Sequence, residues 1–185
     1  MKLQIAADTL SPDELLEYFS EAKNYIDILE LGTPFLLQYG AEIISKLKKI
    51  SPNTEILCDS KIMDAGYYEA EELFKMGADY VTILSVTENS TIKEAVKAAK
   101  KHKKMTVADM ICVHNMKQKA EELEAAGIDV IAVHTGVDQQ KTGRTSLGDL
   151  KELRQCCQAA SIAVAGGITY DTLKEYIAEK PEILV

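Results

Sequence analysis

Two acidic residues and a lysine stand close together in the stretch Cys58 to Gly66, which reads C-D-S-K-I-M-D-A-G and follows the apolar pair Ile56-Leu57. Residues two apart in a strand share a face, so Asp59 and Lys61 are expected to project together from a strand end, with Asp64 on the turn beyond. Two carboxylates around an ammonium group can bind a divalent cation, keep the lysine protonated and stabilise an oxyanion, as chemistry through an enediolate requires. The alternative is a solvated turn after a strand.

A further carboxylate, Glu30, ends another apolar run and is expected beside Asp59 on a neighbouring strand. Mg²⁺ takes one or two carboxylates plus water and substrate oxygens, so Glu30 and Asp59 together predict a Mg²⁺ site. The alternative for Glu30 is an acid that caps a helix. Lys61, flanked in the sequence by Asp59 and Asp64, suits oxyanion stabilisation better than Schiff-base chemistry, and its alternative is a structural salt bridge.

Other polar groups also end apolar runs. His134 follows a predicted buried strand, which suits proton transfer near neutral pH; the alternative is a structural histidine at the rim of the fold. Asp8 and Asp109 are expected to orient hydroxyls or the metal's surroundings, unless each simply begins the following helix. Gly166-Gly167 precedes a predicted helix and offers free backbone amides to a phosphate.

Apolar strands alternate with helical periods along the whole chain. Strands are predicted at Leu3–Ala7, Ile26–Leu29, Glu55–Cys58, Tyr80–Leu84, Met105–Ala108, Asp129–Val133, Ser161–Ala165 and Ile183–Val185. Helices are predicted from Ser11 onward and at Ile43–Ile50, Tyr68–Met76, Ser90–Lys101, Met116–Ala126, Ser146–Ala159 and Asp171–Ala178, with a loop at Thr135–Arg144. This alternation predicts a parallel sheet. Because an open sheet gathers its ligand contacts at one switch point, polar groups at nearly every strand end favour a (β/α)8 TIM barrel over a doubly wound sheet.

The composition narrows the class of protein. With 185 residues, 46% of them hydrophobic, we expect a single domain over residues 1–185. A formal net charge of −8 argues against nucleic acid or an anionic membrane as a partner and favours a small molecule. No apolar run approaches the length needed to span a bilayer, so a cytoplasmic protein is expected, with four cysteines that are reduced and mostly buried.

These motifs resemble those of the orotidine 5'-monophosphate decarboxylase suprafamily, and more narrowly those of its 3-hexulose-6-phosphate synthases. The resemblance spans nearly the whole chain. Its landmarks are Asp8, E-L-G-T-P at Glu30–Pro34, D-S-K-I-M-D-A-G at Asp59–Gly66, D-M-I at Asp109–Ile111, H-T-G-V-D-Q-Q at His134–Gln140 and A-G-G-I at Ala165–Ile168.

The resemblance implies a Mg²⁺-dependent aldolase that joins formaldehyde to D-ribulose 5-phosphate through an enediolate, giving D-arabino-hex-3-ulose 6-phosphate. It implies that Glu30 and Asp59 bind the metal, that Lys61 stabilises the enediolate oxygens and that His134 transfers protons. It also implies a homodimer in which Asp64 reaches into the neighbouring subunit's site.

Two other functions stay open at this point. One is 3-keto-L-gulonate-6-phosphate decarboxylase, although that enzyme typically has Glu where this chain has Asp109, and an Arg-bearing stretch where it has Thr135–Asp138. The other is a non-catalytic binding or interaction protein. Compared with the family it resembles, the chain is expected to form a barrel truncated within or just after its eighth strand, without a second phosphate loop and a final helix.

Overall fold

The computed structural model describes all residues, 1–185, and forms a closed barrel of eight parallel strands. The strands are β1 (Lys2–Ala7), β2 (Ile28–Leu31), β3 (Glu55–Ile62), β4 (Tyr80–Leu84), β5 (Met105–Asp109), β6 (Val130–His134), β7 (Ser161–Ala165) and β8 (Ile183–Leu184). The helices are α1 (Pro12–Ala22), α2 (Thr33–Tyr39), α3 (Ile44–Ile50), α4 (Gly66–Met76), α5 (Asn89–His102), α6 (Met116–Ala126), α7 (Val137–Gln140), α8 (Leu147–Cys156) and α9 (Leu173–Ala178). The predicted (β/α)8 barrel is confirmed.

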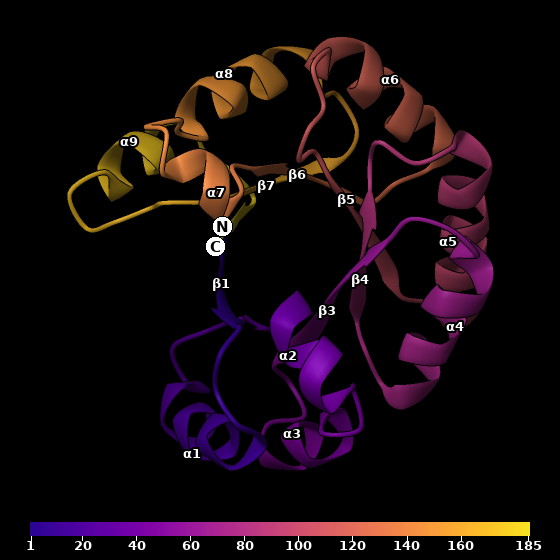
Figure 1. Cartoon of the computed structure of the whole chain (residues 1–185), viewed down its shortest axis with the longest axis vertical. Coiled ribbons are helices and arrows are strands. Elements are labelled where there is room, and N and C mark those ends of the chain that lie inside the picture. Colours follow the sequence, from indigo (N-terminus) through magenta and orange to yellow (C-terminus); the bar gives the residue numbers. More distant parts are fainter.

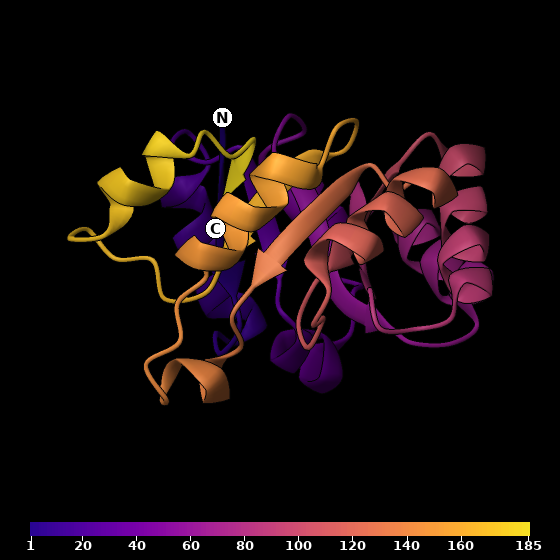
Figure 2. The ribbon, with the colours of Figure 1, turned by 90° about the horizontal axis from the view of Figure 1, so that it is seen from above.

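The barrel closes through its shortest strand. Ile183 of β8 pairs with Lys2 of β1 on one side and with Ala163 of β7 on the other. The first and last strands of the chain are therefore neighbours, and the two chain ends, which overlap in Figure 1, stand apart along the barrel in Figure 2. No helix of the structure combines the length and the apolar character needed to cross a bilayer.

Several helices begin or end at the capping residues that the sequence predicts. α1 begins with a capping box in which the Ser11 side chain accepts from the Glu14 backbone N–H and the Glu14 carboxylate accepts from Ser11. α4 and α6 end at Gly77 and Gly127, both in the left-handed conformation that glycine adopts without steric penalty.

Other limits differ from the prediction. α2 and α7 lie in segments predicted as connections, because Gly32-Thr33-Pro34 reads as a turn and four residues of helix leave no detectable period. α8 ends at Cys156 because the chain turns extended at Cys157. There the carboxylate of Glu124 accepts three successive backbone N–H groups that precede β7. α9 begins at Leu173, two residues later than predicted.

Apolar side chains form two separate layers. The larger layer lies between the strands and the surrounding helices. The smaller one fills the amino-terminal part of the barrel interior, with one residue from each of seven strands, namely Ile28, Leu57, Tyr80, Val107, Val130, Ala163 and Ile183. Apolar side chains fill the barrel at that end, which leaves the carboxyl end, beyond which α7 projects (Figure 2), for ligands.

Candidate active site

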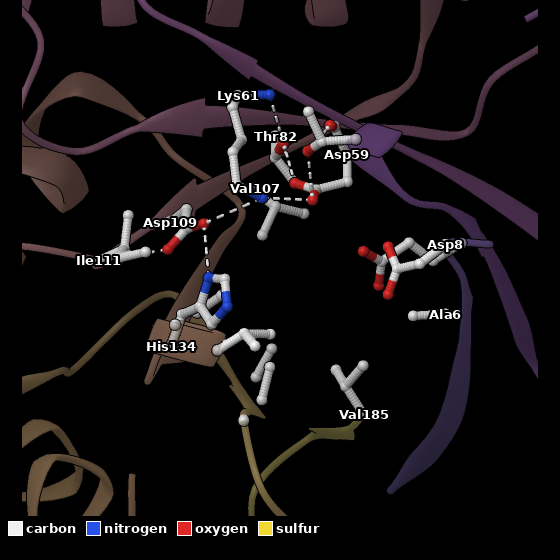
Figure 3. A pocket seen from close by; sticks show the side chains of 18 of the residues that line it. Ala6, Asp8, Asp59, Lys61, Thr82, Val107, Asp109, Ile111, His134 and Val185 are labelled. Carbon is white, nitrogen blue, oxygen red and sulfur yellow. Dashed lines mark hydrogen bonds and ion pairs between the residues drawn. The ribbon is translucent and has the colours of Figure 1, made fainter. Parts of the chain in front are cut away.

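A cavity of about 800 Å³ occupies the carboxyl end of the barrel. Its floor is apolar and includes Leu57, Val107 and Val130, whereas its walls carry polar groups from β1, β2, β3, β5 and β6. Figure 3 shows Asp59, Lys61, Asp109 and His134 along one wall, with Asp8 across the cavity from His134. Seven of the nine predicted site residues line this one cavity; Asp64 and Gly167 do not.

The β3 motif brings opposite charges together. The Lys61 ammonium forms a close ion pair with Asp59 Oδ2, and Asp59 also accepts hydrogen bonds from the hydroxyls of Thr33 (2.7 Å) and Thr82 (2.8 Å). Burial by itself would raise the pKa of Asp59, but the charge of Lys61 and these hydrogen bonds outweigh burial and lower it. Asp59 is therefore held ionised within a half-buried pair.

Asp109 joins this pair to His134. Its Oδ2 accepts a hydrogen bond from His134 Nδ1 at 2.9 Å and lies 3.8 Å from Lys61 Nζ, while Oδ1 accepts from the Ile111 backbone N–H at 2.8 Å. Burial alone would lower the pKa of His134, but the hydrogen bond and charge of Asp109 raise it above its usual value. A carboxylate only accepts, so Nδ1 carries the proton and Nε2, which faces the cavity (Figure 3), is the nitrogen free to take another.

Asp64 does not join Lys61, contrary to the convergence expected from the motif. It is exposed on the turn before α4, and its carboxylate accepts a hydrogen bond from the Ala65 backbone N–H at 2.7 Å. Asp109, from a strand two positions further along the barrel, takes the place of the second acid beside the lysine.

Glu30 lies in a strongly acidic environment. Burial, followed by the negative charge of Asp59, raises the pKa of Glu30 to about 7, and the charge of Asp8 adds to the effect. The Gln4 side chain donates to Glu30 Oε2 at 2.6 Å but leaves its own buried Oε1 without a partner. A bound cation would relieve the repulsion between these carboxylates.

The donor set suits a metal that needs few protein ligands. No group of three or more His, Cys, Asp or Glu side chains is arranged to hold a metal ion. Zinc-type sites usually need at least three such ligands. Mg²⁺ needs only one or two carboxylates, and the adjacent strands β2 and β3 present two to the cavity, Glu30 and Asp59.

The Gly166-Gly167 turn presents unused donors at the edge of the cavity. Neither backbone N–H makes a hydrogen bond within the chain, and both residues adopt positive φ angles, of 101° and 74°. An added Cβ on Gly166 would lie 2.4 Å from the Thr135 carbonyl oxygen, so only glycine fits there. Because α9 begins six residues after Gly167, these donors belong to a loop and not to a helix terminus.

Several polar residues of the cavity were not predicted as site residues from the sequence, among them Gln4, Thr33 and Thr82. Gln4 and Thr82 are each 5 to 6% exposed and each interrupt an apolar strand pattern, which was the signal available. Thr33 lay within a recognised motif and donates to both the carbonyl and the carboxylate of Asp59.

The model of the Orotidine 5'-phosphate decarboxylase / HUMPS family matches residues 1–185. The chain belongs to this family. It is similar to the 3-hexulose-6-phosphate synthase of Staphylococcus haemolyticus, with 42% identity over all of this chain and 88% of that protein.

Solved structures of the family agree with the fold. The crystal structure of 3-hexulose-6-phosphate synthase from Salmonella typhimurium is 44% identical, with a TM-score of 0.96 over all of this chain and 87% of that one. KGPDC from Streptococcus mutans is 26% identical, with a TM-score of 0.86 over 99% of this chain and 85% of that one. The prediction that the chain is an enzyme similar to 3-hexulose-6-phosphate synthases is confirmed, and a non-catalytic binding protein is set aside.

Proposed function

We propose that the chain catalyses the Mg²⁺-dependent aldol addition of D-ribulose 5-phosphate to formaldehyde, giving D-arabino-hex-3-ulose 6-phosphate, and its reverse. The observation that carries the proposal is the continuous chain of contacts from Asp59 through Lys61 and Asp109 to His134 along one cavity wall. It supplies a proton acceptor and a fixed positive charge within one cavity, as proton removal next to a carbonyl requires. The 42% identical synthase supports the choice of substrates.

His134 is the proposed proton carrier. With Nδ1 donating to Asp109, Nε2 takes the proton from C1 of ribulose 5-phosphate, and the electron pair of the C–H bond moves into the enediolate. The enediolate carbon then bonds to the carbon of formaldehyde. The carbonyl oxygen of formaldehyde becomes an alkoxide and takes up the proton that His134 removed from C1. No proton is gained or lost overall, so the reaction balances.

Lys61 stabilises the negative charge that develops on the enediolate oxygens. Ion pairs with Asp59 and Asp109 hold its ammonium group along the cavity wall. Glu30 and Asp59 would hold Mg²⁺, which would supply a second positive charge to stabilise the enediolate. The free amides at Gly166-Gly167 are proposed to bind the substrate's phosphate.

A second copy of the chain is the proposed partner at Asp64. Four apolar side chains of α2, the β3–α4 turn and α4 are exposed, namely Leu37 (84%), Met63 (52%), Tyr68 (68%) and Met76 (43%). Leu37 and Met76 also line a groove of about 240 Å³, together with Leu36 and Leu73. Burial of such a group favours association and would carry Asp64 into the partner's site. The cytoplasmic location and the absence of a nucleic-acid partner remain predictions.

The deciding experiment incubates the protein with Mg²⁺, ribulose 5-phosphate and formaldehyde and follows formaldehyde loss. We expect loss that stops when EDTA is added and that is absent in Lys61→Met. No loss, together with carbon dioxide release from 3-keto-L-gulonate 6-phosphate, would assign the chain to the decarboxylase reaction instead.

Mixing two inactive variants tests the shared site. Lys61→Met and Asp64→Asn are each expected to be inactive as homodimers, whereas refolding them together creates mixed dimers with one intact site. Recovery of about a quarter of the wild-type activity is expected from random pairing. No recovery, in samples shown by mass to contain mixed dimers, would place Asp64 in its own subunit's site.

A further inference from the structure

The backbone pairing between β3 and β4 is interrupted at the segment that carries Asp59 and Lys61. Cys58 pairs with Val81 and Ile62 with Ile83, so three residues of β3 face a single residue of β4. That single residue is Thr82, opposite Asp59, Ser60 and Lys61. The two strands are thus out of step by two residues at this point, and two ladder positions of β3 have no backbone partner on β4.

An irregularity of two residues has a specific consequence for side-chain direction. Side chains alternate with a period of two, so two extra residues leave Asp59 and Lys61 on the interior face, whereas one extra residue would turn Lys61 outward. The chain absorbs the extra length at Lys61, whose φ is +47°. A residue other than glycine is strained in this region, so the surrounding contacts must stabilise it.

Thr82 bonds to all three residues that it faces. Its hydroxyl accepts the Lys61 backbone N–H at 2.9 Å and donates to Asp59 Oδ1 at 2.8 Å. Its carbonyl oxygen accepts from the Ser60 hydroxyl at 3.0 Å. Thr82 is 6% exposed, so solvent has little access to replace these bonds.

We propose that Thr82 is a positioning residue, whose hydroxyl holds the Lys61 backbone in its left-handed conformation and the Asp59 carboxylate beside it. The Thr82 hydroxyl oxygen thereby fixes both the backbone position from which the Lys61 side chain extends and the orientation of the Asp59 carboxylate with which Lys61 pairs. The kinetic part of this inference rests on the proposed aldol function, whereas its structural part does not.

The first measurement needs no substrate. Amide hydrogen exchange, followed residue by residue by NMR, is expected to show a protected Lys61 N–H in the wild type. Exchange at Lys61 should be at least tenfold faster in Thr82→Val and near wild type in Thr82→Ser, which keeps the hydroxyl. Unchanged protection in Thr82→Val would overturn the inference whatever the protein catalyses.

The second measurement follows the C1 proton of ribulose 5-phosphate. Loss of a group that orients a metal ligand typically lowers activity 10- to 100-fold. We therefore expect kcat for C1 proton exchange to be about 10- to 100-fold lower in Thr82→Val, with less than a threefold change in KM. Thr82→Ser should recover to within about threefold of wild type. A Thr82→Val enzyme with wild-type kcat, or a Thr82→Ser enzyme as slow as Thr82→Val, would contradict the inference.

Thr106 on the neighbouring strand β5 provides a matched control. It is also buried, and its hydroxyl donates to Asp129 Oδ2 at 2.9 Å and accepts from the Asp129 backbone N–H at 3.4 Å, outside the cavity. Thr106→Val should lower stability to a similar extent but leave kcat and Lys61 exchange unchanged. An equal loss of kcat in Thr106→Val would mean that Thr82 acts only through stability. If the wild type itself leaves C1 untouched, the proposed function fails while the amide measurement still tests the positioning role.

Discussion

Substitution of Asp109 by Asn tests whether this carboxylate acts through His134. The Asp109 side chain is buried, with 5% of its surface exposed, and accepts two N–H groups, from His134 Nδ1 and from the Ile111 backbone, one on each oxygen. Asparagine has one acceptor oxygen and one NH₂ group, so it can satisfy only one of these donors. If its oxygen faces Ile111, its NH₂ faces His134 Nδ1, which then must give up its proton. The proton moves to Nε2, the nitrogen that faces the cavity, and the base is blocked.

The size of the effect follows from that count of donors. To act as a base in Asp109→Asn, His134 must carry its proton on Nδ1. The asparagine can then accept from only one of the two N–H groups, so one buried N–H is left without an acceptor, which costs about 1–3 kcal/mol. At about 1.4 kcal/mol per factor of ten, Asp109→Asn should slow C1 proton exchange by about 10- to 100-fold. His134→Gln, which removes the base itself, should slow the exchange by about 10²- to 10⁴-fold.

The assay is loss of the C1 proton of ribulose 5-phosphate in D₂O without formaldehyde, which isolates proton removal from carbon–carbon bond formation. Because Asp109 raises the pKa of His134, the pH at which the base becomes half-deprotonated should also fall in Asp109→Asn. The decisive sample is the double variant. If Asp109 acts through His134, the double variant is no slower than His134→Gln alone, whereas multiplied effects would show that Asp109 acts independently and would refute the reasoning.

Three further outcomes are expected. Asp59→Asn should weaken Mg²⁺ binding by at least tenfold in calorimetric titration and lower turnover with it, because one of two proposed carboxylate ligands is lost; unchanged affinity would remove Asp59 from the metal site. Glu124→Gln should lower the free energy of unfolding by about 1–3 kcal/mol in urea at pH 7, because the carboxylate accepts three backbone N–H groups. The pKa of Glu124 is lowered from 4.5 to about 2, so this stabilisation is present above pH 4.5 and is lost as the pH falls towards 2. The difference between wild type and variant should therefore vanish near pH 2, and a difference independent of pH would contradict the assignment. Gly166→Ala should raise the KM for ribulose 5-phosphate more than it lowers kcat, since its Cβ would meet the Thr135 carbonyl oxygen at 2.4 Å and displace the turn; an unchanged KM would argue against phosphate binding there.

Local patterns in the sequence were sufficient for the class of fold and for the place of the site. Alternating apolar strands and helical periods depend on neighbouring residues, so the barrel could be predicted without any knowledge of long-range contacts. The carboxyl ends of parallel strands meet at one end of such a barrel. Polar groups that end separate strands, such as Asp8, Glu30, Asp109 and His134, were therefore expected in one cavity, and all four line it.

The partners of each charge were decided only by the tertiary structure. The motif suggested Asp64 as the second acid beside Lys61, because the two are close in sequence, but the closed barrel places Asp109 of β5 there instead. Thr82 could not be connected with Lys61 from the sequence either. Its role depends on the register between β3 and β4, which is set by the packing of both strands around the whole barrel. Sequence spacing specifies the direction of a side chain along its own strand, whereas the groups that face it come from strands whose alignment is a property of the complete fold.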